Sequence, residues 1–430
     1  MSDPMRLSEI ATWLGGRADV VGGDPVNTDV THDSREVGPG CLFVAIPGAH
    51  VDGHDFVQRA FASGAAAVAV ERDVVGPSRL LVPNARVALP TIAAAVHHDP
   101  SLRLPIVGVT GTNGKTTVTY LLEQIVIADG QTPGVVGTIG ARIGDTAASV
   151  SRTTPEASML QRLLAEMIDA GVDVAAIEVS SHALSLHRVD AIRFRVAAFT
   201  NLMQDHLDFH GDMEGYFAAK AALFTPDRAD HCVVCIDDEA GRRIADAAEI
   251  PTTTVAISRD ADITASAIVE SIDGTSFVVG TPDGSFPVRL PMAGRFNVQN
   301  ALVAAGIALE LGIAPEAITR GLATLDAIPG RFERIATEAG PDIVVDYAHT
   351  PDAIEAVVAD LSGRNALMAL CNTVVTSDVG MACRQAGIPV LSMVYELPTS
   401  IESSLGHGSF MRTLEAARRV VVASDFVRDA

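Results

Sequence analysis

This sequence of 430 residues has few cysteines, few aromatic residues and a shortage of basic residues. Its five cysteines are scattered, and Cys232 and Cys235 form a lone CxxC pair without the second pair that a zinc site needs. We expect this pair to lie in an apolar strand that enters the acidic turn Asp237-Asp238. The scatter is typical of proteins in a reducing cytosol, so a cytoplasmic location is predicted.

Basic residues are too few for a nucleic-acid-binding protein. Lys and Arg total 31 against 53 Asp and Glu, which gives a formal net charge of -22. Because clustered Lys and Arg bind phosphate backbones, no nucleic-acid partner is expected. The sequence also lacks a charged start followed by an apolar core, and charges or glycines break its apolar stretches well short of a membrane span. Neither a signal peptide nor a membrane-spanning segment is predicted.

The apolar residues that are present favour alternating strands and helices. Hydrophobic residues make up 48% and aromatic residues only 4%, so small side chains supply most of the apolar surface. That composition suits α/β layers with small helix faces. Continuous apolar runs at 105–109, 172–179 and 196–200 predict buried parallel strands. With helical segments between them, the fold class expected is α/β with a central doubly wound sheet.

Changes of pattern along the chain divide it into several units, as its length requires. Residues 1–100 form a small α/β unit that ends in a polar His-His-Asp-Pro segment at 97–100, expected to be a solvated linker. A central unit follows at 101–333 and is richer in strands at 231–290. A further unit begins with a strand at 343–345.

A glycine-rich segment, Gly108 to Thr117 (GVTGTNGKTT), follows a predicted strand and precedes a predicted helix at 118–129. This context favours a phosphate-binding loop over a structural turn, because glycines let backbone N–H groups face phosphate oxygens and the helix N-terminus adds positive potential. Lys115 would neutralise the β- and γ-phosphates of ATP, and Thr116 would reach Mg²⁺. Val109 stands where the common motif has glycine, so the loop is a variant. The residues of the loop expected to bind ATP are Gly111, Thr112, Asn113, Gly114, Lys115, Thr116 and Thr117.

The loop variant GxxGTNGKTT resembles that of the Mur ligases and their folylpolyglutamate synthetase relatives. These enzymes activate a carboxylate as an acyl phosphate and let an amine attack it. Further motifs occur in the family's order over about residues 7–361, and they resemble those of the UDP-N-acetylmuramoyl-tripeptide synthetases. The motifs are Asp33-Ser34-Arg35, Thr153-Thr154-Pro155, Glu178-Val179-Ser180-Ser181-His182, Thr200-Asn201-Leu202, Asp205-His206-Leu207-Asp208, Tyr216 to Phe224, Phe296-Asn297-x-x-Asn300 and Asp346-Tyr347-Ala348-His349.

The resemblance implies a three-domain Mur ligase fold and roles for several side chains. Thr116 and Glu178 would supply oxygen ligands to Mg²⁺ near the γ-phosphate, and His206 would join a second Mg²⁺. Lys220 would be carbamylated, which turns a side chain that is ordinarily cationic into an anion able to ligate or orient this metal. Taken alone, Lys220 would be a solvated helix lysine and His206 a surface histidine. The implied catalytic residues are Lys115, Glu178, His206 and Lys220.

Other positions match the family's ligand contacts. Asn297, Arg331 and Asp346 would bind the adenosine part of ATP. Leu186 stands where some family members have a glutamine contact, so one polar contact is expected to be absent. Singly, the serines and threonines of this set also fit helix caps or turns, and only their joint register supports the assignment. The residues implied to bind the UDP-muramoyl dipeptide are His32, Ser34, His50, Thr153, Thr154, Ser180 and Arg188.

Towards the C-terminus the family's motifs end. Its Gly-Gly-Asp-Arg loop and Asp-Asn-Pro-Arg motif, which grip the incoming amino acid, do not occur. The remaining residues resemble a fragment of the Rossmann-like domain of a family-4 glycosyltransferase. We therefore predict the start of a Mur ligase C-terminal domain at 334–362 and a foreign α/β fragment at 363–430, with strands at 366–371 and 388–393.

Together these features predict a monomeric, ATP- and Mg²⁺-dependent amide ligase of peptidoglycan synthesis. Its small-molecule substrates would be UDP-N-acetylmuramoyl-L-alanyl-D-glutamate and a third amino acid, expected to be meso-diaminopimelate, with L-lysine as the alternative. The expected loss of the amino-acid grip leaves two other hypotheses. One is a remnant that binds the UDP-sugar peptide and ATP without joining them, and the other is a fusion product without a selected function. Glycosyl transfer is disfavoured, since half of such an enzyme is absent.

Overall fold

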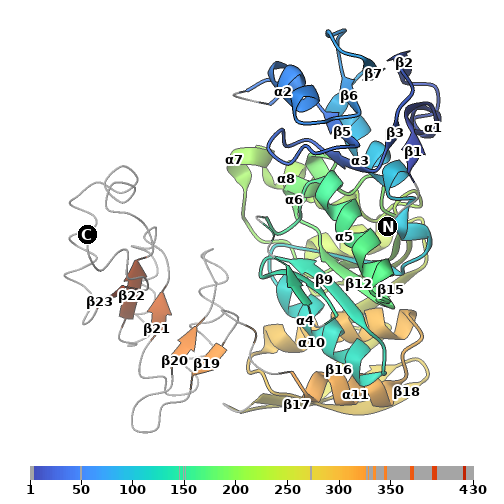
Figure 1. Ribbon diagram of the computed structural model, residues 1–430. Coiled ribbons are helices and arrows are strands. Elements are labelled where there is room, and N and C mark those ends of the chain that lie inside the picture. The colour runs from blue at the N-terminus through green and yellow to red at the C-terminus, as the bar shows by residue number, and fades with distance from the viewer. Residues whose placement is uncertain are drawn as a thin grey trace.

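The computed structural model describes residues 4–328, apart from 49, 50, 145, 149, 151, 272, 273, 326 and 327. Beyond residue 328 it describes only the backbone of a few short strands. These are β19 (Glu333–Ile335), β20 (Ile343–Val345), β21 (Ala369–Cys371), β22 (Val390–Val394) and β23 (Val420–Val422). Figure 1 shows two stacked sheets with helices around them in the main body.

The N-terminal sheet is covered by helices on both faces. Its strands are β2 (Asp19–Gly22), β4 (Asp29–Thr31), β5 (Cys41–Val44), β6 (Ala67–Val70) and β7 (Ser78–Leu81). They lie in the order β2-β7-β6-β5-β4, and only β2 is antiparallel to its neighbour. The helices are α1 (Leu7–Trp13), α2 (Val57–Ala62) and α3 (Ala85–Val96).

The side chains of the central strands point alternately to the two faces of the sheet, which explains why helices cover both faces. In β5, Leu42 and Val44 pack in one core with α1 and α3, whereas Phe43 packs in a second core with α2. Successive side chains of a strand point to opposite faces, so a strand that is apolar throughout is buried on both. Outside this sheet, β1 (Met5–Arg6) pairs with β3 (Val26–Asn27).

The central sheet has eleven strands in the order β11-β10-β9-β12-β8-β13-β14-β15-β16-β17-β18. It is parallel from β9 to β16 and antiparallel at both edges. The predicted apolar runs are β12, β8 and β13 at its centre, which confirms the doubly wound α/β prediction. The strands are β8 (Ile106–Thr110), β9 (Pro133–Gly137), β10 (Gly140–Ile143), β11 (Thr146–Ala148), β12 (Val174–Glu178), β13 (Phe194–Phe199), β14 (Ala229–Cys235), β15 (Thr252–Ala256), β16 (Ile263–Ser271), β17 (Gly274–Thr281) and β18 (Gly284–Leu290).

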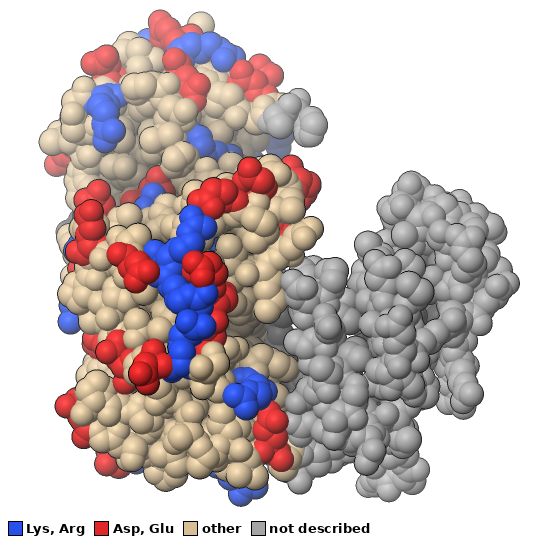
Figure 2. Space-filling model, turned by 180° about the vertical axis from the view of Figure 1, so that it is seen from behind, with Lys and Arg blue, Asp and Glu red and all other residues tan. Residues whose placement is uncertain are grey.

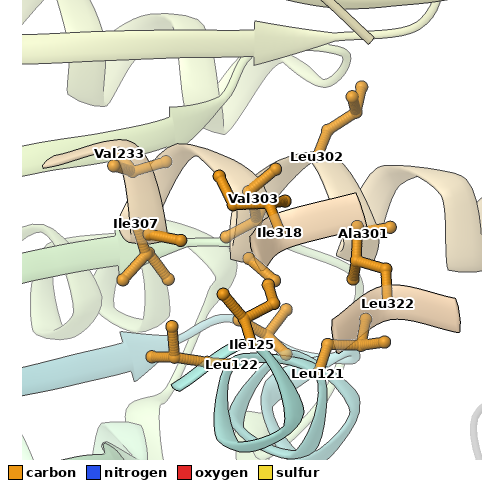
Figure 3. Close-up of a cluster of buried hydrophobic side chains, with 14 of the residues drawn as sticks. Leu121, Leu122, Ile125, Val233, Ala301, Leu302, Val303, Ile307, Ile318 and Leu322 are labelled. Atoms are coloured by element: carbon orange, nitrogen blue, oxygen red, sulfur yellow. The ribbon is translucent and has the colours of Figure 1, made fainter. Parts of the chain in front are cut away.

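Helices cover both faces of the central sheet. On one face α4, α10 and α11 share a core, and Figure 3 shows Leu121 and Ile125 of α4 facing Ile318 and Leu322 of α11. On the other face α5, α6 and α9 share a second core. Gly321 permits the close approach of α11 to α4, because an added Cβ would lie 2.4 Å from the Ile125 Cα. The helices are α4 (Lys115–Ala128), α5 (Ala157–Asp169), α6 (Ser181–Ser185), α7 (Leu207–His210), α8 (Met213–Ala221), α9 (Glu239–Ala247), α10 (Arg295–Glu310) and α11 (Pro315–Ala323).

Helix α5 joins the two sheets. Its first residue, Ala157, belongs to the core of the N-terminal sheet. Arg162 pairs with Asp29 at 3.1 Å and donates to the Val30 carbonyl at 3.3 Å. The solvated linker predicted at 97–100 is wrong for His97, which is buried and lies 3.5 Å from the Asp29 carboxylate. Because α3 and α5 pack against each other, the end of α3 lies inside this seam.

The lone CxxC pair lies in a strand of the central sheet. Cys232 and Cys235 are buried, unpaired thiols in β14, as the strand interpretation requires.

On the face seen in Figure 2, basic side chains form one stripe over the middle of the molecule, with acidic side chains beside it. Within the described part of the chain, no helix combines the length and apolarity needed to cross a membrane.

Beyond residue 328 the described strands form two small sheets. β19 and β20 are an antiparallel pair, and β21, β22 and β23 form a parallel sheet. β21 and β22 confirm the strands predicted at 366–371 and 388–393.

Candidate functional site

The phosphate-binding loop connects the central strand β8 to helix α4. Gly111 and Gly114 have φ angles of +147° and +88°, which side chains with a Cβ rarely adopt, so the loop depends on glycine at both positions. The segment after β13 holds the loop in place. Thr112 donates its N–H to the Asn201 carbonyl at 2.9 Å, and the Thr200 hydroxyl donates to the Asn113 carbonyl at 2.5 Å. Backbone donors before α4 are thus fixed where a phosphate group could accept them.

Changing Gly111 to Ala should disable the loop. An added Cβ would lie 1.9 Å from the Thr200 Oγ1, in addition to the φ strain. We expect a loss of roughly 3 kcal/mol of stability together with weakened ATP binding, measured by thermal melts with and without nucleotide. Gly171→Ala is the matched control, because Gly171 has a φ of +74° and no atom within 4 Å of the added Cβ. Equal effects of the two changes would exclude the proposed contact with Thr200.

Two lysine amines meet at one carbonyl of this loop. Lys115 Nζ donates to the carbonyls of Gly111 and Thr112, and Lys220 Nζ donates to that of Gly111, each at 2.8 Å. Lys220 is buried, with its amine 4.6 Å from the centre of the Tyr216 ring. Burial, and then the nearby Lys115, lower the pKa of Lys220 well below its ordinary value. Lys220 is therefore not the solvated helix lysine that its local sequence suggests.

These two residues are also the only lysines in the sequence, where every other basic side chain apart from histidine is arginine. An ammonium group is compact and loses its proton readily when buried, whereas a guanidinium group is larger and stays charged. Both lysines lie at the same loop. Lysine thus occurs in this chain only at the phosphate-binding loop.

Glu178, at the end of β12, is held beside the loop. Its carboxylate accepts hydrogen bonds from the Thr116 hydroxyl at 3.0 Å, the Thr138 N–H at 2.9 Å and the Thr138 hydroxyl at 3.0 Å. Gly137 leaves room for it, since an added Cβ would lie 2.1 Å from Glu178 Oε1. Thr116 and Glu178 thus bring a hydroxyl and a carboxylate oxygen together, which is the donor set that Mg²⁺ prefers.

The described residues hold no group of three or more His, Cys, Asp or Glu side chains that could bind a metal ion. Mg²⁺ is usually bound through one or two protein oxygens, with substrate phosphates and water completing its shell. The Thr116 and Glu178 pair therefore fits one Mg²⁺. For a second ion, the unmodified Lys220 amine does not fit.

His206 lies on the open side of the site. It adopts a left-handed backbone conformation with φ of +52°, and its side chain is 43% exposed. Its ring centre is 4.7 Å from that of His182, and its Nε2 is 3.4 Å from Asp205 Oδ2. Burial lowers the pKa of His206, Asp205 opposes this, and Lys115 and Lys220 reinforce it. The lowered pKa favours the neutral imidazole, which is the form that binds metals.

The residues matched to the peptide end of the substrate surround Glu178. Thr154 donates its hydroxyl to the Glu178 carbonyl at 2.7 Å and accepts the Ser180 N–H at 3.0 Å. Arg188 donates to the Thr154 carbonyl at 3.1 Å, and Thr153 shares a hydrogen bond of 3.1 Å with Thr138. Ser180 also caps α6, so its local structural role is real. The structure therefore places Thr153, Thr154, Ser180 and Arg188 together.

The residues matched to the two nucleotides lie farther apart. His32 Nδ1, from the N-terminal unit, is 3.3 Å from Ser158 Oγ at the start of α5, and Ser34 lies in the turn 33–36 that directly follows His32. Asn297, in the first turn of α10, donates to the Ala293 carbonyl at 2.7 Å. Asn300, one turn on, lies against Gly114, whose added Cβ would be 2.3 Å from Asn300 Oδ1. His50, Arg331 and Asp346 lie outside the described residues.

Sequence reasoning assigned no role to two residues that hold this site, Thr138 and Tyr216. Thr138 follows β9 and belongs to no recognised motif, so the local sequence does not predict its two hydrogen bonds to Glu178. Tyr216 lies four residues before Lys220, on the same face of α8, and its hydroxyl is 3.1 Å from Thr112 Oγ1. That spacing is a signal that could have identified Tyr216.

Comparisons with protein families match three consecutive parts of the chain. The Mur ligase family catalytic domain matches residues 28–101, the Mur ligase middle domain 109–308, and the Mur ligase glutamate ligase domain 330–429. All three parts of the predicted three-domain α/β fold are therefore present.

Similar proteins and solved structures carry related names. The chain is 43% identical over 338 residues to a UDP-N-acetylmuramoyl-L-alanyl-D-glutamate--2,6-diaminopimelate ligase of Geobacter metallireducens, covering 76% of this chain and 66% of that protein. A protein of the same name from Streptomyces avermitilis is 43% identical over 366 residues, covering 83% and 71%. A solved structure with this name has a TM-score of 0.73 at 27% identity, covering 94% of this chain and 86% of that one. The MurF ligase of Thermotoga maritima in complex with ADP shares the fold, with a TM-score of 0.65 at 20% identity, over 93% and 88% of the two chains.

The third family match corrects the prediction for the C-terminal part. A foreign fragment was predicted at 363–430, but the glutamate ligase domain of the family extends over 330–429. The prediction was wrong because it rested on the absence of two short motifs, whereas the domain pattern runs along the whole segment. The comparisons give no support to the glycosyltransferase resemblance. A remnant or a fusion product without this domain therefore has no basis.

Proposed function

Since the chain belongs to the Mur ligase family, whose members are ATP-dependent ligases, we propose that it adds meso-diaminopimelate to UDP-N-acetylmuramoyl-L-alanyl-D-glutamate. The observation that carries the proposal is the meeting of Lys115, Thr116, Glu178 and Lys220 around one phosphate-binding loop. The names of the relatives support diaminopimelate as the third residue.

The chemistry proposed for this site has two steps. The γ-phosphoryl group of ATP moves to an oxygen of the side-chain carboxylate of D-glutamate, which gives ADP and an acyl phosphate. The amine of the third amino acid then attacks the acyl carbon, phosphate leaves, and the nitrogen loses a proton as the amide forms. The first step brings two anions together, so its catalysis consists mainly of charge neutralisation and positioning.

We assign a separate role in this reaction to each group of site residues. The loop N–H groups and Lys115 hold the phosphates, and Lys115 compensates the charge that builds up as the phosphoryl group moves. Thr116 and Glu178 would hold Mg²⁺, which when bound neutralises phosphate oxygens. Asn297, together with Arg331 and Asp346, would bind the adenosine part. His32, Ser34 and His50 would contact the uridine end, and Thr153, Thr154, Ser180 and Arg188 the muramoyl peptide.

Lys220 would act as a carbamate. A neutral amine adds to carbon dioxide and releases a proton, which leaves an anionic carbamate. Burial of Lys220 favours the neutral amine, and a carbamate there, together with His206, would supply ligands to a second Mg²⁺. We place the reaction in the cytoplasm, catalysed by a monomer.

Product formation tests the proposal. The purified protein is incubated with ATP, Mg²⁺ and UDP-N-acetylmuramoyl-L-alanyl-D-glutamate, together with meso-diaminopimelate or L-lysine. We expect UDP-muramoyl tripeptide, identified by mass, with diaminopimelate as the preferred amine. Nucleotide binding without tripeptide from either amino acid would reject the ligase function.

A further inference from the structure

Three arginines converge on one buried carboxylate at the seam between the two sheets. Arg86, in the first turn of α3, contacts Glu156 Oε2 at 2.6 Å. Arg152 and Arg188 reach Glu156 Oε1 at 2.5 Å and 3.1 Å. These four residues, here called the Glu156 cluster, come from both units of the protein, because Arg86 lies on α3 of the N-terminal unit and the other three belong to the central unit.

The Glu156 cluster carries more positive than negative charge. Three guanidinium groups surround one carboxylate, which leaves two positive charges without a counter-charge inside the cluster. Glu156 and Arg188 are only 9% and 8% exposed, so solvent screens their side chains poorly. The Nε of Arg188 lies 3.1 Å from Glu156 Oε1, but it is buried and makes no well-formed hydrogen bond. A guanidinium offers several N–H donors in a fixed plane, so donors remain for another acceptor.

The surplus positive charge destabilises the folded protein unless a bound anion compensates it. Burial lowers the pKa of Arg188, and Glu156 opposes this, while Arg152 and Arg86 lower it further. His32, from the N-terminal unit, interacts electrostatically with Glu156 and Arg86; burial lowers the pKa of His32, which favours the neutral imidazole and so adds no charge. Such clusters commonly recognise carboxylate or phosphate groups, which bind guanidinium through paired hydrogen bonds.

The position of the cluster connects it to the uridine-nucleotide substrate of the proposed function. Arg188 donates to the Thr154 carbonyl, and the Thr154 hydroxyl donates to the Glu178 carbonyl. On its other side, His32 contacts Ser158, two residues after Glu156. The cluster thus lies between the carboxylate-activating site and the turn matched to uridine. A molecule that spans both would pass beside it.

We propose that Arg86 and Arg152 join Arg188 in one anion-binding site that receives an anionic oxygen group of the uridine-nucleotide substrate, with Glu156 holding the three guanidinium groups in place. This inference rests on the proposed function for the identity of the ligand. Two groups of that substrate have the required chemistry: the α-carboxylate of D-glutamate, which is not activated, and the pyrophosphate. Arg86 makes the site depend on both units at once, so binding of the anion also tightens their seam.

Isothermal titration without ATP or amino acid tests this site. UDP-N-acetylmuramoyl-L-alanyl-D-glutamate is titrated into the wild-type protein and into the variants Arg86→Gln and Arg152→Gln. We expect Kd to rise by about 10- to 100-fold for Arg86→Gln, because a charged hydrogen bond is lost in a poorly screened place. A smaller rise is expected for Arg152→Gln, since Arg152 is 53% exposed.

Arg162→Gln is the matched control, because it removes another arginine from the same seam, where Arg162 pairs with Asp29 away from Glu156. We expect it to change Kd by about twofold at most. Equal losses in Arg86→Gln and Arg162→Gln would reduce Arg86 to a structural contact and overturn the inference, as would unchanged affinity in both Arg86→Gln and Arg152→Gln. Thermal melts of each variant show whether it is folded.

Two further ligands identify the group that is bound. With the α-carboxylate replaced by a carboxamide, the effect of Arg86→Gln should vanish if that carboxylate is the anion. With UDP alone, the effect should persist if the pyrophosphate is the anion. Either result supports the site. If the wild-type protein binds neither the dipeptide ligand nor UDP, the proposed function fails. If the wild-type protein binds the ligand and the Arg86→Gln and Arg152→Gln variants bind it with the same Kd, only the anion-binding site fails.

Discussion

Replacing Lys115 by alanine is expected to lower the rate of tripeptide formation by about 1,000-fold or more. The amine of Lys115 lies over the phosphate-binding loop, where it donates to the carbonyls of Gly111 and Thr112. A bound triphosphate would offer it stronger acceptors, and its charge would compensate the γ-phosphoryl group during transfer. Initial rates at saturating substrates, together with a titration of ATP, measure the loss.

The control for this change removes a positive charge elsewhere. Arg320 lies on α11 and donates to the carbonyl of Ala128 at the far end of α4. Arg320→Ala should leave the rate within about twofold, because exposed charges contribute little. Binding of the UDP-muramoyl dipeptide should be unchanged in both variants. A Lys115→Ala enzyme with near wild-type rate would exclude this loop as the phosphate site.

Replacing Lys220 by alanine is expected to lower the rate by about 100-fold or more, because an anionic metal ligand or orienting group would be lost. Lys220→Arg should be as inactive as the alanine variant, since a guanidinium stays protonated and forms no carbamate. A role of Lys220 as a simple cation predicts the opposite, with Lys220→Arg retaining activity. The comparison of the two variants therefore separates the carbamate from a plain positive charge.

The scarcity of lysine makes the carbamate directly observable. With only Lys115 and Lys220 in the chain, carbon-13 NMR in labelled bicarbonate should show one carbamate signal from a lysine side chain. That signal should disappear in Lys220→Ala and persist in Lys115→Ala. Its persistence in Lys220→Ala would contradict the assignment.

The central part of the site could be predicted from the sequence because its signals are local. A continuous apolar strand, a glycine loop and a helix follow one another between 105 and 129, and the structure has them as β8, the loop and α4. The helix begins at Lys115, earlier than the predicted 118, because the polar residues of the loop already belong to its first turn.

The remaining contacts depend on residues far apart in the chain. Thr138 meets Glu178 across 40 residues, and Arg86 meets Glu156 across 70. No spacing rule connects a turn after one strand with the end of another, so folding alone brings them together. His97 was misjudged for the same reason, since its polar neighbours in sequence suggested exposure to solvent, whereas the folded chain buries it beside Asp29. The C-terminal prediction failed because absent motifs were taken for an absent domain.

Transfer of oxygen from the substrate to phosphate tests the central claim most directly. UDP-N-acetylmuramoyl-L-alanyl-D-glutamate labelled with oxygen-18 in the side-chain carboxylate of D-glutamate is incubated with the protein, ATP, Mg²⁺ and meso-diaminopimelate. If this carboxylate is activated as an acyl phosphate, the released inorganic phosphate carries one labelled oxygen and the tripeptide retains the other. Unlabelled phosphate, released with or without tripeptide, would contradict the account.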